Sequence, residues 1–228
     1  MTALRSVPAR PHPFPMDIAR CALIVIDVQN DFCHPEGYCL GDMAADAETV
    51  ARVRGILPRL AKLLSWTRSQ NMLSVFTKEA HQPDLSDAPA AKALRYENAG
   101  YPIGSAGRRG RYLIRGEWGS QVVDELAAQP GDIVFDKPAQ SIFVATDIDA
   151  LLRDRGITHL LITGVTTECC VLATYRTASD LGYFPLLVED CCAAYEPREH
   201  EAAIDVLLGE NGAVGWVSDV EAVMGGGR

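Results

Sequence analysis

The sequence predicts an α/β protein with a three-layer, Rossmann-like fold, in which a six-stranded, mostly parallel sheet has helices on both faces. Short apolar runs rich in β-branched residues alternate with longer segments of helical spacing, the order expected of parallel strands joined by right-handed crossovers. A length of 228 residues suffices for one such domain. No repeat or linker interrupts the pattern, so we expect a proline-rich arm over residues 1–20 and a single domain over residues 21–228.

The clearest strand is residues 21–28, a continuous apolar run that indicates burial on both faces. Further strands are expected at residues 72–77, 132–137, 159–165, 184–188 and 214–217. Helices are expected at residues 50–70, 121–128, 147–155, 167–181 and 198–208. In the first of these helices, Pro58 indicates a kink or a restart.

Two segments fall outside this alternation. Residues 1–20 carry four prolines, which exclude a helix and favour an extended arm, either loose or docked on a neighbouring subunit. Residues 83–118 form a long segment rich in Gly and Arg, of the kind that covers a site or forms an interface. Its arginines either face an anionic substrate as part of a lid or face solvent or another subunit. They are Arg108, Arg109, Arg111 and Arg115.

The composition of the chain argues against several classes of function. The net charge of −9 argues against binding to nucleic acids and to anionic membrane surfaces. No apolar segment is long enough to cross a bilayer, and residues 1–20 lack the apolar core of a signal peptide. The seven cysteines are an odd number without zinc-ribbon spacing, which favours reduced thiols. We therefore expect a cytoplasmic protein that binds neither nucleic acid nor membranes.

The most informative stretch is residues 160–171, where an apolar strand ends in a glycine turn and a helix follows. Two adjacent cysteines, Cys169 and Cys170, lie at the start of that helix, where the peptide dipoles favour a thiolate. Backbone N–H groups at the same turn have no helical partners and can receive an oxyanion. The residues alone do not decide which cysteine reacts, and both are also compatible with small core residues.

Two other strands place ionisable residues at the same edge of the sheet. Asp27 ends an apolar strand, where a buried carboxylate is costly unless it is paired or used. Lys137 ends another strand; taken alone, it would be interpreted as a surface lysine. Together with a cysteine, Asp27 and Lys137 provide the base, the cation and the nucleophile that thiol catalysis requires. The carboxylate takes the thiol proton, the ammonium lowers the thiol pKa, and the thiolate attacks a carbonyl carbon.

Three blocks in order make the chain resemble the isochorismatase-like cysteine hydrolase superfamily. They are residues 25–32 (VIDVQNDF), 136–143 (DKPAQSIF) and 164–171 (GVTTECCV). The resemblance implies that Cys170 is the nucleophile, Asp27 its base and Lys137 the catalytic lysine. It also implies a non-proline cis peptide before Thr166, with the backbone N–H groups of Thr166 and Cys170 as the oxyanion hole.

Within the superfamily, residues 76–87 (FTKEAHQPDLSD), 114–117 and 189–192 look most like biuret hydrolases and ureidoacrylate amidohydrolases. This resemblance implies cleavage of a C–N bond in a small urea-like compound, with ammonia release through a thioester. It further implies a homo-oligomer, either a dimer or a tetramer, and no cofactor. Relatives such as nicotinamidases bind a metal through an Asp and two His. Here Asp42 has no following histidine pair, so no metal is expected.

Substrate contacts are expected from Phe32, Glu79, Val165 and Glu210. Biuret hydrolases place Gln where this chain has Glu210, which only accepts hydrogen bonds and so favours a cationic end such as that of guanylurea. The alternative is that Glu210 points to solvent. The alternative substrates are ureidoacrylate or an N-carbamoyl amino acid, whose carboxylate the loop arginines would bind. Functions of a different class are a thiol redox protein and a non-catalytic binding domain on the same fold.

Overall fold

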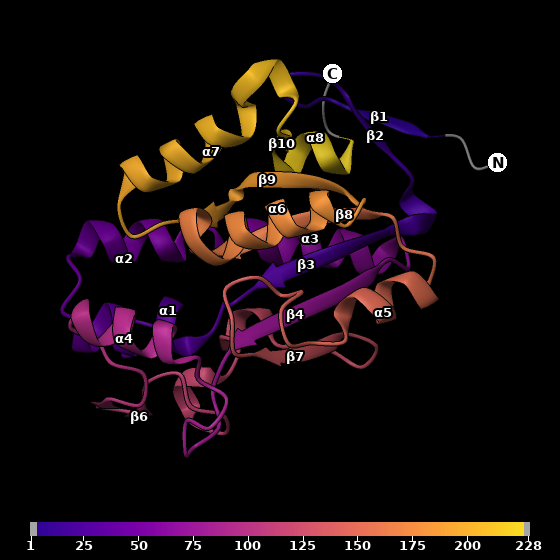
Figure 1. Cartoon of the computed structure of the whole chain (residues 1–228). Helices are drawn as coiled ribbons and strands as arrows, with labels where there is room; N and C mark the ends of the chain where they lie inside the picture. Colours follow the sequence, from indigo (N-terminus) through magenta and orange to yellow (C-terminus); the bar gives the residue numbers. More distant parts are fainter. Residues whose placement is uncertain (1–3, 226–228) are drawn as a thin grey trace.

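The computed structural model describes residues 4–225 and has the expected three layers (Figure 1). Its central sheet has the strand order β10–β9–β8–β3–β4–β7, and all neighbouring strands are parallel. The strands are β3 (Cys21–Ile26), β4 (Leu73–Glu79), β7 (Ile133–Lys137), β8 (His159–Val165), β9 (Phe184–Ala193) and β10 (Trp216–Ser218). The six-stranded parallel sheet that the alternation of elements predicted is confirmed.

Helices cover both faces of the sheet because successive strand residues point to opposite sides. Leu23 of β3 packs in a core with α2 (Ala47–Arg54), α3 (Leu57–Ser69) and α8 (Val220–Met224). Its neighbour Ile24 packs in a second core with α5 (Ile148–Asp154), α6 (Leu172–Asp180) and α7 (Pro197–Gly212). The restart expected near Pro58 occurs between α2 and α3, where Pro58 lies in the first turn of α3.

The strand order reverses between β3 and β8. The chain moves outwards from β3 to β4 and β7, returns to β8 beside β3, and then moves outwards to β9 and β10. In open parallel sheets, the crevice at the carboxyl ends of the strands at such a reversal is where ligands bind. Asp27 follows β3 and Cys170 lies beyond β8, so both lie at this crevice.

The proline-rich arm, described from residue 4 onwards, is docked on its own chain, so the expectation of a loose arm is wrong. Strands β1 (Arg5–Val7) and β2 (Phe14–Met16) form an antiparallel hairpin, and Val7, Phe14 and Met16 are fully buried. The backbone of Arg10 also pairs with Val217 of β10. Apolar side chains next to the prolines provide this burial. Residues 1–3 of the expected arm lie outside the described residues.

The helix expected at residues 121–128 is also wrong. Only single 3-10 turns at Trp118–Ser120 and Asp124–Leu126 lie in this region. The chain bonds instead to the loop after β3, where the Val123 N–H donates to the Val28 carbonyl at 3.1 Å. Tertiary backbone bonds therefore override the local helical pattern.

The loops around the crevice contain short elements that the sequence did not indicate. Residues 83–118 include helix α4 (Ala90–Asn98) and a small hairpin of β5 (Ala106–Gly107) and β6 (Gly110–Arg111). After β3 come α1 (Asn30–Cys33) and a π-helical turn at Tyr38–Asp42. Among residues 4–225, no helix combines the length and apolar character needed to cross a membrane.

Candidate active site

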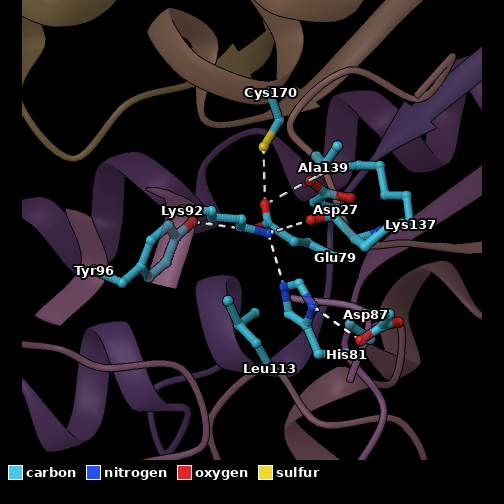
Figure 2. Close-up of polar contacts among 12 residues, drawn as sticks. Asp27, Glu79, His81, Asp87, Lys92, Tyr96, Leu113, Lys137, Ala139 and Cys170 are labelled. Atoms are coloured by element: carbon cyan, nitrogen blue, oxygen red, sulfur yellow. Dashed lines mark hydrogen bonds and ion pairs between the residues drawn. The ribbon is translucent and has the colours of Figure 1, made fainter. Parts of the chain in front are cut away.

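Four buried ionisable side chains meet at the carboxyl ends of neighbouring strands (Figure 2). Asp27 follows β3, Glu79 ends β4, Lys137 ends β7 and Cys170 lies just beyond β8. The first three are fully buried, and Cys170 is 4% exposed. The structure thus brings the predicted Asp27, Lys137 and Cys170 together, and it adds Glu79, which the sequence indicated only as a substrate contact.

The backbone around the end of β8 presents Cys170 to this cluster. Gly164 has a φ of 115° and lies so close to β3 that a Cβ there would be 2.0 Å from the Ile26 carbonyl oxygen. The Val165–Thr166 peptide is cis, as the resemblance implied. A π-helical turn, Thr167–Val171, then leads into α6. Only glycine permits this close approach of β8 to β3.

The geometry favours Cys170 over Cys169 as the nucleophile. The Cys170 Sγ donates a hydrogen bond to Glu79 Oε2 at 3.1 Å. It also lies within 4.8 Å of the nearest carboxylate oxygen of Asp27. Cys169 is more exposed, at intermediate burial, and lies on the wall of the cavity described below. Cys170 therefore has the partners that nucleophilic attack requires.

Asp27 and Lys137 form a tight buried ion pair. Lys137 Nζ lies 2.7 Å from Asp27 Oδ2, and the Thr77 hydroxyl donates to Asp27 Oδ1 at 2.8 Å. Lys137 also donates to the Ala139 carbonyl at 2.7 Å and lies 3.7 Å from Glu79 Oε2. Lys137 is therefore held between the two carboxylates, and the prediction that it is an active-site rather than a surface lysine is supported by its burial.

A second buried ion pair lies on the other side of Glu79. Lys92, on α4, is 4% exposed, and its Nζ lies 2.5 Å from Glu79 Oε1. The Tyr96 hydroxyl, one turn later on α4, donates to the same oxygen at 2.9 Å. Lys92 and Tyr96 were not predicted from the sequence, because residues 83–118 lack the regular alternation of strands and helices. The spacing of four residues between Lys92 and Tyr96 would place both side chains on the same face of a helix, and this was the available indication that they act on one partner.

The environments of the two carboxylates push their pKa values in opposite directions. Burial raises the pKa of Asp27 despite the opposing charge of Lys137. Burial also favours protonation of Glu79, but Lys137 and Lys92 outweigh it and lower the pKa of Glu79 to about 2. For Lys137, burial is outweighed by the charges of Asp27, Cys170 and Glu79, so its pKa rises. Glu79 is therefore the carboxylate that is ionised most readily.

The surroundings of Cys170 favour the thiol over the thiolate. A hydrogen bond with Cys169 and burial raise the pKa of Cys170 well above its ordinary value, and the negative charge of Glu79 adds to this rise. Lys137 opposes these effects without reversing them. The expectation of a lowered thiol pKa is therefore wrong for the resting site. A thiol in such surroundings needs a neighbouring base in order to act as a nucleophile.

A cavity of about 540 Å³ opens onto Cys170, a size suited to a small molecule. The predicted contacts Phe32, Glu79 and Val165 line it, and so does Thr166. Much of the remaining wall is aromatic, formed by Tyr96, Tyr101, Tyr112 and Tyr195. The other ionisable groups of the wall, apart from cysteines, are acidic: Asp46, Glu168, Glu196 and Glu199. No Lys, Arg or His side chain of residues 4–225 is part of this lining.

Glu210 does not contact this cavity, so its prediction as a substrate contact is wrong. It lies at the far end of α7, exposed and with a φ of 50°, whereas the cavity is lined by Glu196 and Glu199 at the start of the same helix. The chain turns into a left-handed conformation at this point, which directs Glu210 to solvent. In this structure Glu210 is a solvent-exposed residue at a helix end.

The loop arginines are also not part of the cavity lining. Arg108 lies 3.1 Å from Asp42, Arg109 lies 2.6 Å from Glu36, and Arg115 lies 2.7 Å from Asp87. Arg111 donates to the backbone carbonyls of Pro83 and Gly104. Each guanidinium is thus engaged within the loops, and the interpretation of these residues as an anion-facing lid is wrong for this structure.

Residues 21–222 match the family model of the isochorismatase domain. The chain belongs to the isochorismatase family. The resemblance found in the sequence is thereby confirmed at the level of the family.

Solved structures share this fold. An isochorismatase family protein from Desulfovibrio vulgaris subsp. vulgaris str. Hildenborough is 28% identical, covers 90% of this chain and 96% of its own, and has a TM-score of 0.72. A cysteine hydrolase from Pseudomonas syringae pv. phaseolicola 1448A is 23% identical, with coverage of 98% and 97% and a TM-score of 0.76. N-carbamoylsarcosine amidase from Thermoplasma acidophilum is 24% identical, with coverage of 89% and 97% and a TM-score of 0.67. The last two similarities show the shared fold alone.

In this isochorismatase-family site, three groups have ligand atoms close enough to approach a metal. The ligand atoms of Asp27, Glu79 and Cys170 all lie within 4.8 Å of one another. However, the ammonium groups of Lys137 and Lys92 already pair with the two carboxylates at 2.7 and 2.5 Å. A divalent cation would have to displace both buried ammonium groups, so the cluster does not fit one. The predicted absence of a metal and of a cofactor stays a prediction.

Proposed function

We propose that this isochorismatase-family protein is a cysteine amidohydrolase that cleaves a C–N bond of a small, urea-like compound. The observation that carries the proposal is the buried Cys170 thiol, hydrogen-bonded to a carboxylate and close to Lys137, in the lining of a cavity of small-molecule size. A thiol with an adjacent base and a fixed cation is suited to attack on a carbonyl carbon.

The reaction would proceed in two halves. Cys170 loses its proton to a neighbouring carboxylate and attacks the carbonyl carbon, and the backbone N–H groups of Thr166 and Cys170 stabilise the oxyanion. The leaving nitrogen takes the proton and departs as ammonia, which leaves a thioester on Cys170. Water then hydrolyses the thioester with the same carboxylate as base, and the thiol is regenerated.

The lining of the cavity supports a neutral or cationic substrate. Among the lining residues, Asp46, Glu168, Glu196 and Glu199 belong to none of the ion pairs found among the described residues. One carboxylate oxygen of Glu168, Oε2, is buried without a hydrogen-bond partner. A substrate with several N–H donors, such as biuret or guanylurea, would satisfy these acceptors. A substrate carboxylate would meet negative charge without a cation to bind it, which disfavours ureidoacrylate and N-carbamoyl amino acids.

Ammonia release from a panel of biuret, guanylurea, ureidoacrylate and N-carbamoylsarcosine tests this function, with Cys170→Ala as the control. We expect turnover of biuret or guanylurea that the substitution abolishes. Exclusive turnover of the two acids would contradict the substrate class. A folded protein that turns over no member of the panel would instead favour the non-catalytic binding domain.

A thiol redox function has less support. Cys169 and Cys170, like Cys191 and Cys192, are free, and adjacent cysteines rarely form a relaxed disulfide. We further propose a dimer or tetramer in the cytoplasm that binds neither nucleic acid nor membranes. Size-exclusion chromatography with light scattering tests the oligomer, and a monomer would contradict it.

A further inference from the structure

The wall of the active-site cavity contains a buried carboxylate oxygen that no group among residues 4–225 satisfies. Glu168, a half-buried residue, lines the cavity two residues before Cys170, and its Oε2 is buried without a hydrogen-bond partner. Burial of a carboxylate oxygen without a donor is costly. An unsatisfied acceptor on the wall of a binding cavity therefore indicates a ligand that donates to it.

The other acidic residues of the wall have structural roles of their own. Asp46 is exposed and caps α2, where its side chain accepts from the Thr49 N–H at 2.7 Å. Glu196, also exposed, and Glu199 lie at the start of α7, where the helix dipole favours negative charge. Glu168 Oε2, by contrast, takes part in no bond of this kind. It is therefore the carboxylate oxygen of the wall that is most available to a ligand.

Glu168 is held near a second carboxylate. The Thr167 side-chain oxygen and His200 Nδ1 lie 2.8 Å apart, which joins the turn that carries the nucleophile to the beginning of α7. Burial raises the pKa of Glu168, and the negative charge of Glu199 adds to this rise. Hydrogen bonds with its own N–H group and with Thr166 oppose these effects without reversing them. A cationic ligand beside the two carboxylates would relieve their repulsion.

The aromatic part of the wall suits a flat cation. The rings of Tyr96 and Tyr101 pack edge to face with their centroids 5.5 Å apart, and the Tyr112 ring lies 6.5 Å from that of Tyr101. All three line the cavity, together with Phe32 and Tyr195. Aromatic faces attract cations, most strongly where water is excluded. A planar guanidinium group also stacks on such faces and presents paired N–H donors that match a carboxylate.

We propose that Glu168 is a specificity-determining residue that binds a planar amidinium or guanidinium group of the substrate, with Glu199 as a second anionic contact. The inference rests on the proposed amidohydrolase function and narrows its substrate class to urea-like amides with a cationic end, such as guanylurea. The cation lies at Glu168 Oε2 while the carbonyl carbon lies at Cys170, which follows in the same turn. Neutral biuret has a similar shape but lacks the charge-assisted hydrogen bond.

Glu168→Gln is the first test, because the amide keeps the size of the side chain and removes its charge. The measured quantity is the ratio of kcat/KM for guanylurea to kcat/KM for biuret. We expect this ratio to fall about tenfold or more, the usual effect of losing a hydrogen bond between charged groups, with the change mainly in KM. A purely structural defect would slow both substrates alike and leave the ratio unchanged. Glu97→Gln is the matched control, since Glu97 is exposed on α4 and outside the cavity lining. It should keep the wild-type ratio.

The second test compares two small probes of the same shape, guanidinium chloride and urea, of which only guanidinium is charged. Both are used at millimolar concentrations, well below those that unfold proteins, with sodium chloride to keep the ionic strength equal. We expect guanidinium to compete with guanylurea in the wild type about tenfold more strongly than urea does. In Glu168→Gln this advantage of guanidinium should disappear.

A lower ratio in Glu168→Gln and selective inhibition by guanidinium support the proposal. An unchanged ratio in the folded variant would overturn it, as would turnover of biuret but not of guanylurea. If the variant does not fold, equal inhibition of the wild type by guanidinium and urea would overturn it instead. If the wild type hydrolyses none of the amides, the proposed function fails, and isothermal titration calorimetry still decides the cation contact. Tighter binding of guanylurea than of biuret supports that contact, and equal or absent binding overturns it.

Discussion

Gly164→Ala should destabilise the protein far more than an alanine at another glycine with a similar backbone conformation. Gly164 and Gly182 have φ values of 115° and 87°, so an alanine is strained at both. At Gly182 nothing lies within 4 Å of the added Cβ, whereas at Gly164 the Cβ would be 2.0 Å from the Ile26 carbonyl oxygen and 2.7 Å from the Ile26 nitrogen. Both atoms belong to the backbone of β3, which cannot move aside alone.

The magnitude follows from these contacts. Backbone strain at positive φ costs about 1–2 kcal/mol, and an alanine recovers about 0.4–1 kcal/mol by restricting the unfolded chain. Gly182→Ala should therefore cost about 1 kcal/mol or less. Gly164→Ala adds the clash, for which overpacking contributes about 1–3 kcal/mol or more. We expect a total of about 2–4 kcal/mol and a separation of β8 from β3 where Asp27 and Cys170 meet.

Urea unfolding followed by circular dichroism measures this difference. With an m value of about 3 kcal/mol per molar, an excess of about 1–3 kcal/mol lowers the midpoint by about 0.3–1 M relative to Gly182→Ala. Equal midpoints for the two variants would refute the reasoning, because they would mean that β3 and β8 do not approach as closely as the structure shows.

Three further predictions follow from the site and the arm. Cys170→Ala should abolish ammonia release while Cys169→Ala retains most of it; the reverse result would assign the nucleophile to Cys169. Phe14 is fully buried beside Trp216, so Phe14→Ala should lower the free energy of unfolding by about 3–5 kcal/mol. An unchanged midpoint of urea unfolding would mean that the arm is not docked. The pKa of Glu79 is lowered from 4.5 to about 2, so its contribution to stability is present above pH 4.5 and lost as the pH falls towards 2. Acid unfolding should consequently depend less steeply on pH in Glu79→Gln, and an unchanged slope would contradict the lowered pKa.

Three of the four buried ionisable side chains of the candidate site could be predicted from the sequence, whereas the residues around them could not. Cys170, Asp27 and Lys137 each end or follow a strand, and the alternation of elements brings strand ends to one edge. Lys92 lies in a segment without a strand signal, and its contact with Glu79 depends on how α4 packs over the sheet. Glu210 shows the converse error, since the resemblance to biuret hydrolases implied a substrate contact, whereas Glu210 lies exposed at the end of α7 and outside the cavity lining.

By itself, the sequence determined the six parallel strands, their approximate bounds and the family, because these depend on apolar periodicity and on short motifs read along the chain. The tertiary structure decided which carboxylate touches the thiol, which lysine stabilises that carboxylate, and which charges line the cavity. It also decided that the proline-rich arm packs on its own domain. These outcomes depend on contacts between residues far apart in the chain, where burial and a few ångströms of separation determine protonation, and no local pattern encodes those distances.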